Sequence, residues 1–293
     1  MADQLQIDRS TLSKVLSGTY KAEDLTPMLQ RIRAFRIKVE GPEGVSAVIG
    51  FRETRTVRSI LQAYTKARLD GEMVILVGEG GEGKTWAFRE IIRRANQHGQ
   101  PPPVYLSCNV FTSAYALTLR LAQELGVGRK ETADWTATQV AEKLRYHPRV
   151  LIIDEINYVQ RKAADILRWL RDETAVGIMM AGNAALDGGP RTRGGLLWDI
   201  VTHHPDVEPI VSRARILEMP GIFPDEVEAI ATDVLGGFSS NGTERLIQRV
   251  GYSIRMLTRM IHELRELHKG RPGSIGATMV DEAWSRLYSK RGR

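Results

Sequence analysis

A glycine-rich stretch at residues 78–85, GEGGEGKT, constrains the fold of this chain more than any other feature. It matches the pattern G-x-x-x-x-G-K-[ST], in which backbone N–H groups curl around phosphate oxygens. Glycines are needed because the backbone turns tightly there and a Cβ would clash. The apolar run MVILV precedes the loop and a helical pattern follows it, which is the context that this motif requires. The sequence therefore predicts a nucleotide site inside an α/β domain.

We expect this loop to bind ATP together with Mg²⁺. The N-terminal dipole of the following helix favours an anion, and Lys84 is expected to reach the β and γ phosphates. The hydroxyl of Thr85 is expected to hold Mg²⁺. The predicted cofactor-binding residues of this stretch are Gly78, Glu79, Gly80, Gly81, Glu82, Gly83, Lys84, Thr85 and Trp86.

Five apolar runs without alternation predict a parallel sheet that is buried on both faces and covered by helices. From residue 224 onward only helical patterns recur, which predicts a small helical lid domain at the C-terminus. The predicted strands lie in residues 73–78, 103–108, 150–155, 176–183 and 214–221. The predicted domains are a head (1–40), a Gly/Pro-containing linker (41–47), a nucleotide-binding α/β domain (48–221) and a helical lid with a basic tail (222–293).

Two acids end the third predicted strand, VLIIDE. Asp154 is expected to hold Mg²⁺ through water, and Glu155 to orient and deprotonate an attacking water. An activated water favours a hydrolase over a small-molecule kinase. Asn183 ends the fourth strand, where ligands of parallel sheets gather, so its amide could help to hold that water. A helix-cap or turn role is the alternative for Asn183.

Composition excludes several classes of protein. The longest apolar runs are far shorter than the ~20 residues of a membrane helix, and we expect no membrane association. Cys108 is the only cysteine, so no internal disulfide can form and a reducing, cytoplasmic compartment is expected. The net charge is +6, but residues 245–293 hold eleven basic and four acidic residues. Such a block attracts polyanions, although a solvated helical face explains it equally well.

The order of these motifs resembles the AAA+ ATPases, and the resemblance extends over about residues 48–288. It implies that Asn183 is the sensor-1 residue and that Arg255, in GYSIRML, is the sensor-2 arginine of the lid. It also implies that Arg213, in IVSRARI, is an arginine finger acting on a neighbouring subunit's nucleotide, with Arg215 as the competing candidate. A finger supplied in trans makes hydrolysis depend on assembly, so the family implies a ring or a helical filament.

The N-terminal stretch DRSTLSKVLSGTY predicts a partial helix-turn-helix head. Leu12, Val15 and Leu16 lie on one helical face. Another face offers small polar and basic groups that suit DNA, and the alternative is an unremarkable amphipathic helix pair. The candidate DNA contacts there are Ser10, Thr11 and Lys14. The chain opens inside the second helix of the expected motif, so we expect an incomplete head.

A repressor-like head joined to an AAA+ module resembles the MuB family of transposition proteins, which is related to the TnsC and IstB regulators. The resemblance implies an ATPase that polymerises on duplex target DNA, selects the target and recruits or stimulates a transposase, with hydrolysis driving disassembly. It also implies a bacterial cytoplasm and a phage or mobile element as the source.

The family grips DNA through basic loops, and the candidate loop here is DGGPRTRGG, with Arg191 and Arg193. Such a loop suits phosphates more than base edges. A plain surface loop is the alternative. For the whole chain we keep three further functions open: a helicase loader or replication initiator, a signalling ATPase and, least favoured, a metabolite kinase.

Overall fold

The computed structural model describes residues 49–128, 132–183, 196–269 and 273–289, and every structural statement below concerns these residues. By its contacts the chain divides into two units, residues 1–50 and 51–293, and the fold described is that of the second unit. The predicted head and linker lie outside the described residues.

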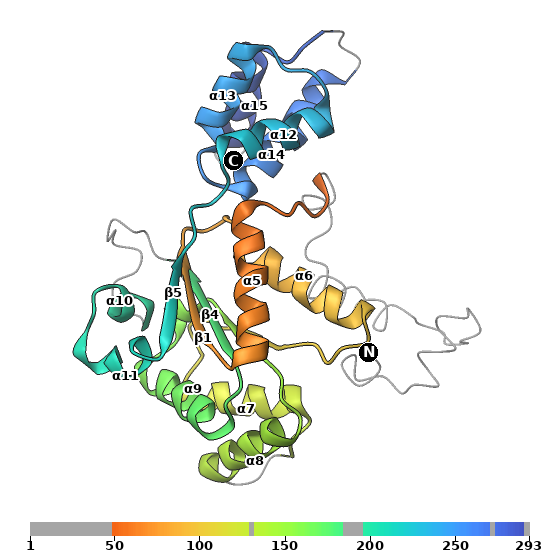
Figure 1. Ribbon diagram of the computed structural model, residues 1–293. Helices are drawn as coiled ribbons and strands as arrows, with labels where there is room; N and C mark the ends of the chain where they lie inside the picture. Colours follow the sequence, from red (N-terminus) through yellow and green to blue (C-terminus); the bar gives the residue numbers. More distant parts are fainter. Residues whose placement is uncertain (1–48, 129–131, 184–195, 270–272, 290–293) are drawn as a thin grey trace, which may run out of the picture. The chain divides into compact units, whose positions relative to one another are not determined.

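Five parallel strands form the predicted sheet (Figure 1). Their order across the sheet is β2-β3-β4-β1-β5, and every neighbouring pair is parallel. The register pairs Gly78 with Asn183 and Ser107 with Asp154, so the ends of these strands meet at one edge of the sheet. The strands are β1 (Met73–Gly78), β2 (Val104–Ser107), β3 (Leu151–Asp154), β4 (Ile178–Asn183) and β5 (Ala214–Glu218).

The two faces of the sheet carry separate hydrophobic cores, because successive side chains of a strand point to opposite faces. Ile75 and Val77 of β1 belong to one core, whereas Val74 and Leu76 belong to the other. All six residues of β1 are buried, which explains why its sequence is apolar without alternation. This double burial fixes the strand that carries the phosphate loop.

Helices cover both faces of the sheet (Figure 1). α5 and α6 contribute to the core that contains Val74, and α7 to α10 contribute to the other core. α5 begins after Thr54, whose side chain accepts a hydrogen bond from the N–H of Val57. The helices are α5 (Arg55–Asp70), α6 (Lys84–Gln97), α7 (Ala114–Leu125), α8 (Ala133–Tyr146), α9 (Arg161–Thr174), α10 (Leu196–Val201) and α11 (Glu208–Val211).

Four helices after β5 pack on one another as the predicted helical region. Leu257, Ile261 and Leu264 of α14 are fully or almost fully buried. Arg245 and Arg249 of α13 both donate hydrogen bonds to the carboxylate of Asp281 on α15. These helices are α12 (Pro224–Leu235), α13 (Ser240–Val250), α14 (Ile254–His268) and α15 (Ala277–Ser289). No described helix combines the length and the apolar composition that crossing a membrane requires.

The segment between β5 and α12 is anchored to the start of α5 and to the turn before α14. The hydroxyl of Thr56 donates to the carbonyl of Gly221, and the N–H of Ile222 donates to the carbonyl of Tyr252. Gly221 has a φ of +77°, and a Cβ there would lie 2.2 Å from the Tyr252 carbonyl oxygen. Only glycine fits this turn, which leads the chain from the sheet into the four helices.

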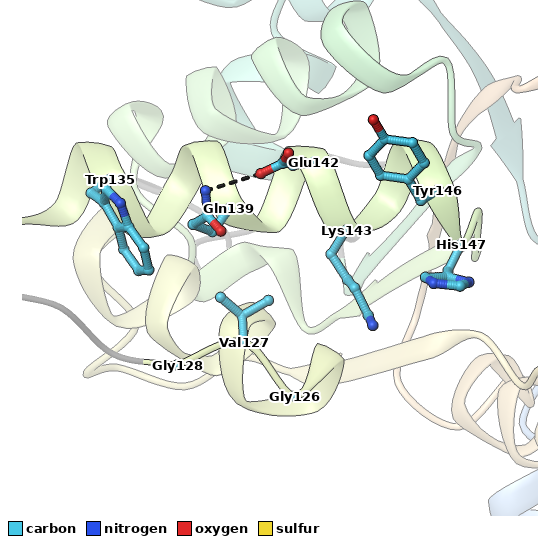
Figure 2. Close-up of a pocket in the computed structure, with 9 residues that line it drawn as sticks. All are labelled: Gly126, Val127, Gly128, Trp135, Gln139, Glu142, Lys143, Tyr146 and His147. Atoms are coloured by element: carbon cyan, nitrogen blue, oxygen red, sulfur yellow. Dashed lines mark hydrogen bonds between the residues drawn. The ribbon is translucent and has the colours of Figure 1, made fainter.

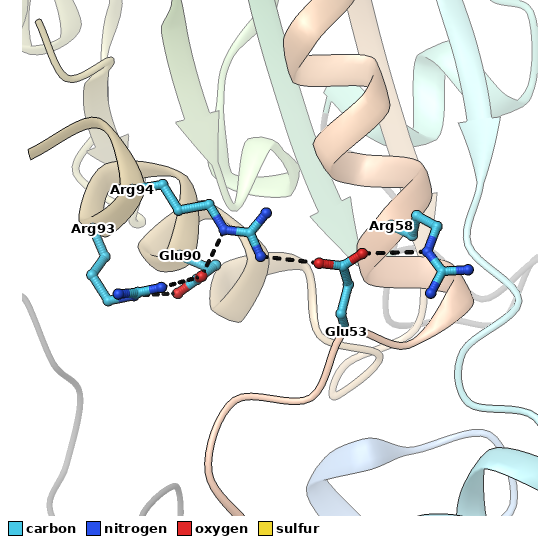
Figure 3. Close-up of polar contacts among 5 residues, drawn as sticks. All are labelled: Glu53, Arg58, Glu90, Arg93 and Arg94. Carbon is cyan, nitrogen blue, oxygen red and sulfur yellow. Dashed lines mark hydrogen bonds and ion pairs between the residues drawn. The ribbon is translucent and has the colours of Figure 1, made fainter. Parts of the chain in front are cut away.

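An ion-pair network joins the segment before α5 to α6 (Figure 3). Glu53 accepts hydrogen bonds from Arg58 of α5 at 3.3 Å and from Arg94 of α6 at 3.0 Å. Arg94 also donates to the buried Glu90, which accepts from Arg93 as well. Since α6 is the helix that starts at the phosphate loop, this network holds that helix against the start of α5.

Candidate functional site

The glycine-rich loop connects β1 to α6 in the way that the sequence predicts. Gly81 and Gly83 have φ angles of +105° and +103°, a region that favours glycine. Gly83 is the N-cap of α6, and no side chain caps this helix. The first turn of α6 contains no acidic residue either. An uncapped helix start next to a lysine fits a phosphate group, so the loop is suited to ATP.

Two glycines of the loop are required by the protein's own side chains. A Cβ at Gly78 would lie 2.0 Å from Oε2 of Glu82, and a Cβ at Gly81 would lie 2.6 Å from Oγ of Ser253. Sequence reasoning attributed the glycines to the tight turn alone. The structure adds that Gly78 makes room for an acid of the loop and that Gly81 makes room for the residue before α14.

Lys84, the first residue of α6, is buried with its ammonium inside the loop. Its Nζ donates to the carbonyl oxygens of Gly78 at 2.8 Å and Glu79 at 2.6 Å. Oε2 of Glu82 lies 3.5 Å from the same nitrogen. Burial lowers the pKa of Lys84, and the carboxylate of Glu82 opposes that shift. Burial likewise raises the pKa of Glu82, and Lys84 opposes it.

Asp154, at the end of β3, receives hydrogen bonds from three sides. Thr85 Oγ1 donates to its Oδ2 at 2.7 Å, and the hydroxyl of Tyr105 donates to the same oxygen at 2.9 Å. The N–H of Glu155 donates to Oδ1. Burial and the charge of Asp154 raise the pKa of the Tyr105 phenol, which therefore stays a donor. Tyr105 lies on β2, and sequence reasoning did not identify it.

The Thr85–Asp154 pair fits Mg²⁺ in its donor chemistry, because hydroxyl and carboxylate oxygens are the ligands that this ion takes. The rest of its ligand set would come from nucleotide phosphates and water. The described residues contain no group of three or more His, Cys, Asp or Glu side chains that could hold a metal ion.

Glu155 follows β3 with a φ of +60°, which is unusual for a residue with a side chain. Nδ2 of Asn183 donates to its Oε2 at 2.9 Å, so β4 and the residue after β3 share one hydrogen bond. Asn157 bonds both residues: its Oδ1 accepts from the N–H of Asn183, and its amide bonds the Glu155 carboxylate. Burial and the neighbouring Asp154 raise the pKa of Glu155, which suits a proton acceptor near neutral pH.

Asn157 had no recognisable signal in the sequence, because its contact with Asn183 joins residues 26 positions apart. The strained conformation of Glu155 brings Asn157, two residues later, back toward the end of β4. A motif search identifies Glu155 and Asn183, but it does not identify Asn157, which lies between them.

The lid meets the phosphate loop at the start of α14. The N–H of Arg255 donates to the carbonyl of Gly81 at 3.2 Å. Its Nη1 lies 4.0 Å from the position that a Cβ on Gly80 would take. Arg255 is exposed, and the 4.0 Å distance places its guanidinium beside Gly80. Its predicted sensor-2 role stays a prediction. Trp86 lies in the first turn of α6 and packs edge-on against Phe51, with ring centroids 5.7 Å apart.

Arg213 lies directly before β5 and is exposed. Its guanidinium donates to the carbonyl of Pro209 at 2.7 Å and to Asp172 of α9 at 3.3 Å. The competing candidate, Arg215, lies within β5 and pairs with Glu72. The described contacts of both arginines are thus with surface groups of the same chain. The candidate DNA contacts Ser10, Thr11, Lys14, Arg191 and Arg193 lie outside the described residues.

A pocket of about 410 Å³ lies elsewhere, between α8 and the turn that follows α7 (Figure 2). Trp135, Lys143 and Tyr146 of α8 line it together with the glycines of the turn. None of its nine lining residues belongs to the predicted site.

Comparison with known proteins agrees with this geometry. A family described as an AAA domain matches residues 68–188. The ATP-dependent target DNA activator B of Escherichia phage Mu is 27% identical over 194 residues, which are 64% of this chain and 60% of that protein. The Mu-like prophage FluMu DNA transposition protein B of Haemophilus influenzae is 25% identical over 217 residues, 71% of this chain and 74% of that protein. This chain thus spans less than two thirds of the phage Mu protein's length.

Solved structures share the fold. The Aeropyrum pernix ORC1 protein, solved in complex with DNA, aligns with a TM-score of 0.57 and 15% identity, covering 85% of this chain and 70% of that one. CDC6P from Pyrobaculum aerophilum aligns with the same TM-score and 14% identity, covering 86% and 71%. At such identities the likeness concerns the fold, which is the AAA+ P-loop fold.

Proposed function

Because this chain belongs to the MuB-like AAA+ ATPases, we propose that it is an ATP-dependent regulator of DNA transposition that assembles on duplex target DNA. In this proposal the assembled protein selects the target and recruits or stimulates a transposase. ATP hydrolysis then dismantles the assembly. The relatives named above support a role in DNA transposition, and the residues of the site support ATP hydrolysis.

The observation that carries the proposal is that Lys84 and two hydrogen-bonded pairs meet at one edge of the sheet. Lys84 stands inside the loop, Thr85 bonds Asp154, and Asn183 bonds Glu155. A magnesium ion bound with the nucleotide would neutralise charge that develops on the phosphates. Thr85 and Asp154 are the residues that would hold it.

Glu155 is the residue that we propose as the acceptor of a proton from the attacking water. The amide of Asn183 bonds one of its oxygens and so fixes the direction of the carboxylate. Lys84 would bind the phosphates, and Arg255 would reach them from the lid. Each of these side chains comes from a different element, which explains why the site depends on the complete AAA+ fold.

We further propose that Arg213 acts on the nucleotide of a neighbouring copy. It is exposed and lies before the edge strand β5, where a second copy can approach it. Hydrolysis would then require assembly, either as a helical filament or as a ring. Phosphate-contacting arginines supplied in trans typically raise the rate by about 10³-fold or more.

The proposed DNA contacts are Arg191 and Arg193 in a glycine-flanked loop, and Ser10, Thr11 and Lys14 in the head. Two arginines between glycines suit the phosphate backbone, so the binding would depend little on sequence. Replacing both Arg191 and Arg193 by alanine should weaken DNA binding for all sequences and flatten its salt dependence. Unchanged binding in a salt titration would remove this loop from the interface.

We place the protein in the cytoplasm of a bacterial host, encoded by a phage or mobile element.

Electron microscopy of the protein with long duplex DNA, Mg²⁺ and ATP tests this function. We expect filaments that require ATP. Lys84→Ala should abolish them because the phosphates lose their ammonium partner, and Glu155→Gln should preserve them because hydrolysis stops. Discrete rings that bind a replicative helicase would instead support the helicase-loader alternative, and DNA without any bound assembly would contradict the proposal.

A further inference from the structure

The ammonium group of Lys84 has an acceptor for each of its three N–H bonds. Two are backbone carbonyls, those of Gly78 at 2.8 Å and Glu79 at 2.6 Å. The third is the carboxylate of Glu82, whose Oε2 lies 3.5 Å away. A lysine ammonium has three donors and no more. A phosphate can therefore bond Lys84 only by replacing one of these oxygens.

Glu82 is fixed in this position. Its side chain is 6% exposed, as is that of Lys84. Its Oε2 packs against the backbone of Gly78, where a Cβ would be 2.0 Å away, and a backbone hydrogen bond at Glu79 stabilises its charged form. A buried carboxylate loses most of its hydration, so it depends on these partners. The acid cannot move into solvent unless the loop changes shape.

A buried carboxylate at Glu82 is unexpected in a loop that is proposed to bind phosphates. The loop suits a polyanion, yet it buries a carboxylate next to the one lysine that the polyanion needs. Like charges at such distances repel strongly where water is excluded. Glu79 provides the contrast within the same loop: it is exposed, and it meets Lys84 through its backbone carbonyl.

We propose that Glu82 is a positioning residue that competes with the nucleotide phosphates for the ammonium of Lys84 and thereby weakens ATP binding. This inference rests on the proposed function, because it assumes that the loop binds ATP. Of the three oxygens around Lys84, only that of Glu82 belongs to a side chain, so a phosphate that replaces it leaves both backbone carbonyl contacts of the ammonium in place. The competition raises the ATP concentration at which copies of the chain assemble.

Equilibrium binding of a fluorescent ATP analogue to the full chain, with Mg²⁺ and without DNA, tests this inference. Glu82→Gln keeps the shape of the side chain and removes its charge. We expect it to lower the Kd by roughly three- to tenfold, in line with the loss of one partly screened charge contact. Glu228→Gln is the matched control, because it removes an equal charge from an exposed position of α12 outside the predicted site.

An equal gain from Glu228→Gln would show a general charge effect and would overturn the role of Glu82. An unchanged or higher Kd for Glu82→Gln would overturn it as well, since Glu82 would then support binding. A thermal unfolding scan of each variant confirms that the variant is folded. The DNA-dependent ATPase adds a separate readout: KM for ATP should fall with Kd while kcat stays within about twofold, as expected for a change in binding alone. If the unaltered chain bound no ATP, the proposed function itself would fail.

Discussion

At the scale of single residues, the carboxylate of Asp154 is held by more than the motif that names it. Thr85 and Tyr105 donate to the same oxygen, and the latter comes from a neighbouring strand. Partners of this kind orient a metal ligand and are commonly as important as the ligand itself. Tyr105 is therefore a supporting residue of the proposed Mg²⁺ site.

We predict that Tyr105→Phe raises the Mg²⁺ concentration needed for half-maximal ATPase activity by about tenfold, because Asp154 loses one of its orienting donors. A magnesium titration at saturating ATP measures the shift. Tyr115→Phe, which alters an exposed tyrosine of α7, serves as the control. Equal magnesium requirements for Tyr105→Phe and the unaltered chain would show that Thr85 and the N–H of Glu155 suffice to orient the carboxylate.

The sequence identified the residues that a motif defines, but not those that act through contacts. Lys84, Thr85 and Asp154 stand where the pattern predicts, because the pattern encodes a local backbone path between a strand and a helix. Glu82 was predicted as one more loop residue, and its pairing with Lys84 depends on how the loop packs on itself. Tyr105 looked like an ordinary apolar strand position. Such contacts depend on strand register and rotamers, which a single sequence does not reveal.

At the scale of elements, the five strands were predictable because each is a short run rich in apolar residues. The expected burial on both faces does not hold for β5, an edge strand in which no residue is buried. The residues at which the strands end were harder to predict. The last predicted strand extended over residues 214–221, whereas β5 ends at Glu218. Pro220 has no N–H for a sheet hydrogen bond, and Gly221 begins the turn toward α12. The short helices α10 and α11 were not predicted, since six and four residues are too few to show a helical period.

The end of α5 offers a test of how closely the helices pack on the sheet. Gly71 and Gly126 end α5 and α7 in nearly the same left-handed conformation, with φ angles of +64° and +68°. A Cβ at Gly71 would lie 2.2 Å from the carbonyl oxygen of Ala175, whereas one at Gly126 would meet nothing within 4 Å. Both replacements by alanine strain the backbone, but only the first also produces a collision.

We predict that Gly126→Ala lowers the free energy of unfolding by about 1–2 kcal/mol, the cost of the left-handed conformation. Gly71→Ala should cost about 1–3 kcal/mol more, because α5 must shift away from the segment that enters β4. Urea unfolding of both variants without nucleotide measures the difference. Equal costs would mean that α5 is free to adjust its position.

At the scale of the whole molecule, we propose that a neighbouring copy completes the nucleotide site. Arg213 is exposed and pairs with Asp172 of its own surface, and such a pair contributes little to stability. The arginine can therefore exchange this partner for a phosphate of a neighbouring copy. The sequence predicted this arginine-finger role only through the family resemblance. No local sequence pattern indicates whether an arginine contacts the nucleotide of its own subunit or that of a neighbour.

Mixing two inactive variants tests the arginine in trans. Arg213→Ala should lower DNA-dependent ATPase activity by about 10³-fold because a neighbouring site loses its finger. Glu155→Gln should be equally inactive because it cannot take a proton from the attacking water, although it still binds ATP and assembles. A mixture should regain activity, since each intact site can meet an intact finger. A mixture that is no more active than its parts, or a larger loss from Arg215→Ala than from Arg213→Ala, would refute the assignment.

Sedimentation velocity of the purified chain tests the central claim most directly, that bound ATP joins copies of the chain around duplex DNA. With ATP, Mg²⁺ and duplex DNA together, we predict large complexes that contain both protein and DNA, and none when Lys84→Ala replaces the unaltered chain. A protein that sediments as a monomer with all three present would contradict the account.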